Sequence, residues 1–218
     1  MANSKLTIYN DALIELGQTR LSVSNGLSED REARYILDAV YDNVITECLQ
    51  AGDWNFATRE VQAASDTGVT ESFGFTETIG KPTDWIRTVA LSDTENHTTP
   101  MLATEYEDNT DHWATNSSPI YVKYISNDSS WGLSLTAWPW SFTRYVIVSL
   151  AERGCMAITH DDSLQDRLTR LTLPRAKRSA LSKDAVNQGT RFPRVSSWNN
   201  ARGSRNGRER GRWNQFTG

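Results

Sequence analysis

The chain has few of the residues from which disulfides and metal sites are built. Its two cysteines, Cys48 and Cys155, are far apart in the sequence, and neither has a second cysteine at metal-binding spacing. The histidines His97, His112 and His160 lie in polar stretches or at a helix boundary, none beside a ligand at helical or turn spacing. We therefore expect no metal, and two reduced thiols on apolar helical faces.

Sequence motifs of catalysis are also missing. There is no glycine-rich phosphate loop, no nucleophile elbow and no paired-cysteine site. Asp161 and Asp162 next to His160 could form a metal site, but both are explained more simply as capping residues of the following helix. The sequence therefore predicts a protein that is not an enzyme and binds no cofactor.

Long apolar runs are absent as well. No segment approaches the roughly 20 apolar residues that cross a bilayer, and the N-terminus, Met-Ala-Asn-Ser-Lys, opens no signal segment. The 218 residues suffice for one sizeable core or two small ones. We expect a soluble protein, made in a cytoplasm, without a membrane partner.

What the chain does have is a basic, aromatic tail at residues 190–218. Seven arginines against Glu209 give it a net charge of +6, which leaves −10 for residues 1–189 of a chain whose formal charge is −4. The tail has too few apolar residues to fold alone. A solvated terminus without a partner is the simplest alternative, but its two tryptophans and two phenylalanines are costly to leave in water. We therefore expect an extended arm that binds a partner, either a nucleic acid or an acidic protein groove. Its candidate binding residues are Arg191, Phe192, Arg194, Trp198, Arg202, Arg205, Arg208, Arg210, Arg212, Trp213 and Phe216.

Two amphipathic helices are expected at the start of the chain. The first is predicted from the helical spacing of Leu6, Tyr9, Ala12, Leu13 and Leu16. Asn3 or Ser4 can cap it, and Gly17 can end it. We expect it to form an antiparallel pair with the second helix.

The second helix is expected to begin at a Ser28 cap and to end near Gly52. Its first turn would carry Glu29, Asp30 and Glu32, whose charge suits a helix N-terminus. Its apolar stripe is predicted to comprise Ala33, Ile36, Leu37, Val40, Val44, Ile45, Cys48 and Leu49.

A mostly β insertion with long loops is expected after Phe56. The region to about Thr136 is rich in Thr, Ser, Asp and Gly, with strand-like runs at 85–91 and 120–125. In the second run Ile120, Val122 and Tyr124 share one face. The pattern predicts a β-rich region between two helical segments.

Helical character returns at Trp138. A buried helix is predicted from Phe142, Tyr145, Val146, Ile147, Val148, Leu150, Ala151, Ala157 and Ile158. A last helix, capped by Asp161, Asp162 or Ser163, should carry Leu164, Leu168 and Leu171 and be kinked or restarted by Pro174.

Four aromatic residues flank the β insertion. Trp138 and Trp140 lie where it returns to the helices, and Trp54 and Phe56 where it leaves them. The stretch 131–140 could form a ligand box, but we favour core packing for all four residues, as seals of a structural junction.

Together these elements predict an α+β fold: an antiparallel bundle of about four helices with a mostly β insertion and an extended C-terminal arm. The expected divisions are 1–57 (the N-terminal helix pair), 58–137 (the β-rich insertion), 138–189 (the C-terminal helices) and 190–218 (the arm).

Several of these segments resemble a known family. They are Ile8–Gly17 (IYNDALIELG), Ala33–Leu37 leading to Tyr41-Asp42, Asp53–Ala57 (DWNFA) after the second helix, and the helix at 138–157. The combination is similar to the head-to-tail adaptors of tailed bacteriophages, of the kind called tail tubular protein A in short-tailed phages. The resemblance covers the first 60 residues well and 138–160 more loosely.

The resemblance implies a structural virion protein in the neck between capsid and tail, assembled in the host cytoplasm. It implies a ring of twelve copies under the portal, in contact with the next neck or tail protein and lining a channel through which genomic DNA passes without sequence-specific binding. By the same analogy the arm, from Arg191 to Phe216, would dock on the portal protein. The alternative is a nucleic-acid-binding protein that uses the Arg/Gly/Trp-rich tail.

Overall fold

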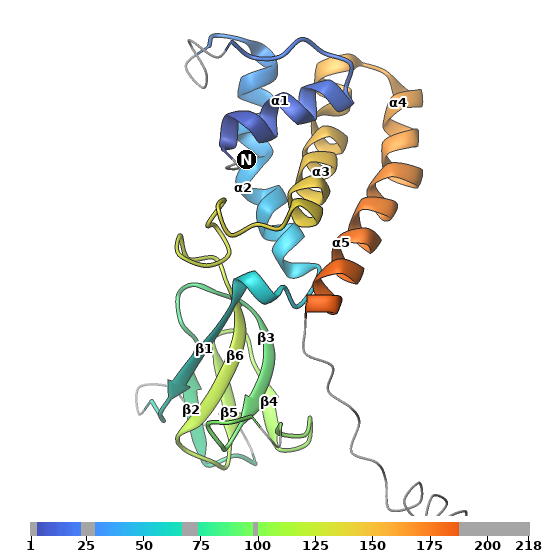
Figure 1. Ribbon diagram of the computed structural model, residues 1–218. Helices are drawn as coiled ribbons and strands as arrows, with labels where there is room; N and C mark the ends of the chain where they lie inside the picture. The colour runs from blue at the N-terminus through green and yellow to red at the C-terminus, as the bar shows by residue number, and fades with distance from the viewer. Residues whose placement is uncertain (1–3, 23–28, 67–73, 98–99, 188–218) are drawn as a thin grey trace, which may run out of the picture. The chain divides into compact units, whose positions relative to one another are not determined.

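The computed structural model describes residues 4–22, 29–66, 74–97 and 100–187 (Figure 1). Contacts group residues 1–187 into one compact unit. The fold is α+β, as the sequence predicts: in the described residues, helices precede and follow six strands that form two small antiparallel sheets. The predicted arm at 190–218 and the predicted Ser28 cap lie outside the described residues.

The first two helices are α1 (Lys5–Glu15) and α2 (Glu32–Gln50). The hydroxyl of Ser4 accepts a hydrogen bond from the backbone N–H of Thr7 at 3.1 Å and so caps α1. Gly17 leaves the helix with a φ of +69°, a backbone conformation that glycine adopts without strain. The Tyr9 hydroxyl of α1 donates to Asp38 Oδ1 of α2 at 2.6 Å. The predicted antiparallel pairing of these two helices was wrong, because α1 lies across α2 and packs mainly against α3 (Figure 1).

The predicted start of α2 was wrong by about one turn. The N-cap position is Arg31, so Glu29 and Asp30 precede the helix. Glu29 accepts a hydrogen bond from the backbone N–H of Ser22, and Asp30 accepts one from the Tyr35 hydroxyl at 2.9 Å. Both carboxylates thus bind the loop and the helix surface, and only Glu32 lies in the first turn.

The other helical segment comprises α3 (Trp140–Thr159), α4 (Asp162–Arg167), a π-helical turn η3 (Leu168–Thr172) and α5 (Leu173–Asn187). α3 packs against α1, α2 and α5, and it runs antiparallel to α2 and α5 (Figure 1). The predicted break at Pro174 takes the form of η3, after which α5 begins one residue before the proline. α3 is buried along most of its length. Two of the predicted apolar positions are nevertheless exposed, Ala157 in α3 and Leu171 in η3.

The strands lie between the two helical segments in sequence. After a 3-10 turn η2 (Asn55–Ala57), β1 (Thr58–Ala63), β6 (Ile120–Ser126) and β3 (Trp85–Ser92) form one sheet with β6 in the centre. The other sheet has β5 (His112–Thr115) between β2 (Glu77–Gly80) and β4 (Tyr106–Asp108). The strands predicted at 85–91 and 120–125 are therefore confirmed, each extended by one residue.

Two apolar clusters hold the unit together. The larger one lies among the helices and includes Ile86 and Ile125 from the first sheet. The smaller one lies between the sheets, where Ile79 and Trp113 meet Leu91 and the face of β6 that carries Ile120, Val122 and Tyr124. Because side chains alternate along a strand, β6 contributes to both clusters from its two faces.

Candidate interaction site

An aromatic cluster lies where the strands leave and rejoin the helices. Trp54 is 1% exposed, and its indole N–H donates to the Cys48 carbonyl at 2.9 Å. Its ring centroid lies 4.8 Å from that of Phe142, edge to face, and Trp138 contacts the same ring at 5.0 Å. Phe56, half-buried, lies 4.7 Å from Phe142. Core packing is thus confirmed for Trp54, Trp138 and, in part, Phe56.

A buried carboxylate joins this junction to the end of α5. Asp184 Oδ2 accepts hydrogen bonds from the backbone N–H and the side-chain amide of Asn55, both at 3.1 Å, and its carbonyl accepts another at 2.9 Å. Burial raises the pKa of Asp184, and the bonds from Asn55 only partly offset it. Nearby, a Cβ on Gly52, just after α2, would lie 2.4 Å from Leu181 Cδ2 of α5, so a larger residue there would require the leucine side chain to move.

Trp140 departs from the prediction. Its side chain is 62% exposed, so the expectation that it packs in the core is wrong. Pro139 is the N-cap of α3 and Trp140 the first helical residue, four positions before the charged Arg144. Residues four apart share a helix face, and the buried face of α3 begins instead at Phe142. A large aromatic ring therefore lies on the surface beside a cation.

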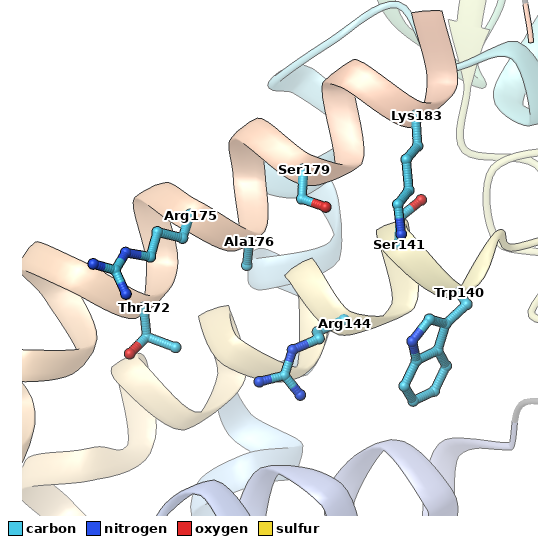
Figure 2. A pocket seen from close by; sticks show the side chains of 8 residues that line it. All are labelled: Trp140, Ser141, Arg144, Thr172, Arg175, Ala176, Ser179 and Lys183. Atoms are coloured by element: carbon cyan, nitrogen blue, oxygen red, sulfur yellow. The ribbon is translucent and has the colours of Figure 1, made fainter. Parts of the chain in front are cut away.

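Trp140 lines a half-open groove between α3 and α5, with a volume of about 330 Å³ (Figure 2). From α3 the lining side chains are Trp140, Ser141 and Arg144. From η3 and α5 they are Thr172, Arg175, Ala176, Ser179 and Lys183. We call this the α3–α5 groove. Besides the indole, Ala176 is its one apolar lining residue; cations and hydroxyls supply the rest.

The α3–α5 groove is cationic. Arg144 Nη2 lies 3.0 Å from Glu15 Oε1 at the end of α1, whereas Arg175 and Lys183 form no ion pair with any described residue. No described side chain caps the N-terminus of α3, which adds the positive end of the helix dipole. From α5, Lys183 extends toward Ser141 of α3, whereas Arg175 points along α5, away from Lys183 (Figure 2).

Charge is unevenly distributed along the chain. Residues 138–187 contain eight basic and five acidic side chains, a net charge of +3, whereas residues 1–137 have eight basic and 21 acidic ones, a net charge of −13. The groove thus belongs to a basic segment that is followed in sequence by the basic arm residues.

The residues considered for metal or nucleophilic chemistry do not come together. His112 contacts Asp111 and Asn109, while His160 ends α3 in a left-handed conformation. Asp161 Oδ1 accepts hydrogen bonds from the backbone N–H groups of Ser163 and Leu164, which confirms the predicted cap. Within the described ranges, no three His, Cys, Asp or Glu side chains lie close enough together to hold a metal ion.

The two thiols are structural. Cys48 and Cys155 are both buried, as expected for core residues. Burial raises the pKa of Cys48 to about 12, so its sulfur is protonated at neutral pH and is a poor nucleophile.

The arm residues named as candidate partner contacts, Arg191 to Phe216, lie outside the described residues, so their role stays a prediction. The α3–α5 groove was missed because its residues lie on two helices more than 25 positions apart. The spacing of Arg175, Ser179 and Lys183, every fourth residue, was the available signal for a shared polar face.

Among the described residues, no helix has both the length and the apolar character needed to cross a membrane. Searches against protein-family models and against curated proteins find no match for the chain.

Proposed function

We propose that this protein is a structural virion component, a head-to-tail adaptor that forms a ring under the portal and joins the capsid to the neck or tail. The observation that carries the proposal is the position of the adaptor-like segment Asp53–Ala57. Trp54 and Phe56 of that segment seal the aromatic junction, and Asn55 binds Asp184 of α5. The family-like residues thus hold a scaffold together, as an adaptor requires.

The other adaptor-like segment has the same character. In Ile8–Gly17 the side chains of Ile8, Tyr9 and Leu13 are fully buried against the other helices. Fixed packing suits a protein that bears load between larger components. It is the opposite of an active site, where polar groups converge on a cavity.

In this proposal the arm at 190–218 attaches the adaptor to the portal protein. Its aromatic residues would be buried as anchors on the portal, and its charge of +6 would favour an acidic surface there. The acidic N-terminal two thirds of the chain, at −13, suits a channel wall that does not retain passing DNA.

The proposal is tested by native mass spectrometry of the full chain mixed with its cognate portal ring, with duplex DNA as a parallel partner. We expect loading of about one copy per portal subunit, lost when residues 190–218 are deleted. Both apolar clusters lie within residues 1–187, so the truncated body should stay folded. If it unfolds, the arm is part of the core and the docking role is wrong.

Two matched arm variants separate anchoring from charge. One replaces Trp198, Trp213 and Phe216 by Ala and keeps every arginine; the other replaces Arg205, Arg208 and Arg210 by Gln and keeps every ring. We expect the first to abolish loading and the second to weaken it in a salt-dependent way. Absence of portal binding, with salt-sensitive DNA binding that needs the arm, would instead favour the nucleic-acid-binding alternative.

A further inference from the structure

We propose that the α3–α5 groove binds single-stranded nucleic acid, with Arg175 and Lys183 on backbone phosphates and Trp140 stacked on a base. This inference rests on the described residues of the groove and stands apart from the adaptor proposal. It assigns a ligand to a surface on the helical body, separate from the arm.

The spacing of the cations favours a polymer over a small anion. Arg175 and Lys183 are eight residues apart on α5, which at 1.5 Å per residue places them about 12 Å apart along the axis. Figure 2 shows Arg175 pointing away from Lys183, so a single small anion does not bridge the two charged ends. A strand that rises about 3.4 Å per stacked nucleotide spans this axial distance in three to four nucleotides.

The remaining lining fits the same ligand. Ser179 lies between the two cations on α5, with Thr172 on one side, and both hydroxyls can donate to phosphate or sugar oxygens. Arg144 of α3 adds a third cation, which is also paired with Glu15. The row of donors runs along one face of a helix, as an extended backbone requires (Figure 2).

Trp140 selects unpaired bases. An indole that is 62% exposed, at the edge of a cationic groove, offers a flat face for stacking. The bases of a duplex are stacked on each other and cannot use it. Single strands should therefore bind more tightly than duplex of the same length.

The other occupant to consider is an acidic protein surface, such as that of a second copy. Protein interfaces gain most of their affinity from apolar anchors buried in pockets, and the groove offers one alanine beside the indole. Its chemistry of cations, hydroxyls and a single ring suits a polyanion with planar bases better.

The experiment is a fluorescence-anisotropy titration of a labelled single-stranded oligonucleotide with the full-length protein at several salt concentrations. The groove variant is Arg175→Gln with Lys183→Gln. The matched control is Lys177→Gln with Arg178→Gln, which removes the same charge from the same helix but from a separate hollow lined by Pro174 and Leu181. All four side chains are exposed, so both variants should fold alike.

We expect the groove variant to bind more weakly and to lower the slope of log affinity against log salt by about 1.4, the value for two lost contacts to a single strand. The control variant should keep the slope of the original protein. Equal slopes in the two variants, or no binding by the original protein, would overturn the proposal, because binding would then reflect overall charge or the arm.

Trp140 gives a second, independent readout. Trp140→Ala should reduce single-strand affinity roughly tenfold or more, whereas Trp140→Phe, which keeps a stacking ring, should lose less. Portal loading should not change in either variant, which separates this result from the adaptor test. If Trp140→Ala and the groove variant alter self-association in sedimentation and leave nucleic-acid affinity unchanged, the groove is a contact between copies and the proposal is wrong.

Discussion

The helices and the sheets are stabilised in different ways. The helical cluster is built from aliphatic and aromatic side chains, with the rings of Trp54, Trp138 and Phe142 in mutual contact. The cluster between the sheets is much smaller and is surrounded by buried or half-buried charges. A short strand buries little apolar area, so polar contacts have a larger part in fixing the sheets.

Two charged residues illustrate this in the sheet region. Asp84 accepts hydrogen bonds from the Tyr124 hydroxyl at 3.2 Å, from Ser126 at 2.5 Å and from Arg59 at 3.0 Å, all on β1 or β6. The ammonium of Lys81, whose side chain is 4% exposed, lies 3.6 Å from the Trp85 ring centroid and pairs with Asp108. The helices thus have the larger apolar cluster, and in the sheets specific polar pairs supplement a smaller one.

The largest expected effect is in the helical core. Trp54→Ala should lower the free energy of unfolding by about 3–5 kcal/mol, because it leaves a cavity against Phe142 and frees the Cys48 carbonyl. Trp54→Phe should cost less, since most of the volume stays. Urea unfolding monitored by far-UV circular dichroism measures both. A cost below about 0.5 kcal/mol for the alanine variant would place Trp54 on the surface and contradict the packing described here.

The next effect tests the polar stabilisation of the sheets. Asp84→Ala should cost about 2–3 kcal/mol near neutral pH, because three donors lose a charged acceptor. Burial alone would raise the pKa of Asp84, but the bonds from Ser126, Arg59 and Tyr124 more than offset it and hold the pKa below its usual value.

A carboxylate with a lowered pKa stabilises the fold above the unfolded pKa, about 3.9, and that stability is lost as pH falls through the folded value. The difference between the original protein and Asp84→Ala should therefore shrink below about pH 4. Urea unfolding across this range measures it. A difference that stays constant with pH would show that the side chain acts through shape and not through its charge.

A smaller loss of stability, with the opposite pH dependence, is expected at Asp184. The pKa of Asp184 is raised by burial, so its contribution to stability is fully present below the unfolded pKa, about 3.9, and is lost as pH rises through the folded pKa. Asp184→Ala should cost about 1–2 kcal/mol by leaving the Asn55 donors unpaired.

Asp184→Asn is the matched control, because one amide oxygen can still accept both bonds from Asn55. It should stay within about 0.5 kcal/mol of the original protein at neutral pH and remove this part of the pH dependence. Urea unfolding of the three proteins at neutral and mildly acidic pH provides the comparison. An asparagine variant as unstable as the alanine variant would show that the ionised form is required.

The sequence predicted the helices better than the sheets. Helical spacing and caps gave α1, the body of α3 and the Asp161 cap, because an amphipathic helix is determined by residues near one another in sequence. β3 and β6 were found by alternation, but β2, β4 and β5 have three or four residues each, too few to show a period. The Asn55–Asp184 contact spans 129 positions, and no local pattern indicates it.

The smallest effect on stability is expected from a substitution of Trp140, whose exposure contrasts with that of Trp54. Both were predicted to seal the junction, yet one is 1% and the other 62% exposed. Trp140→Ala should change the free energy of unfolding by less than about 0.5 kcal/mol, since exposed side chains leave no cavity. Measured beside Trp54→Ala in the same urea titration, a cost above about 2 kcal/mol would mean that the indole is buried in solution. A negligible cost would show that the fold does not require this ring. The exposed indole would then be free to contact a ligand in the groove that it lines.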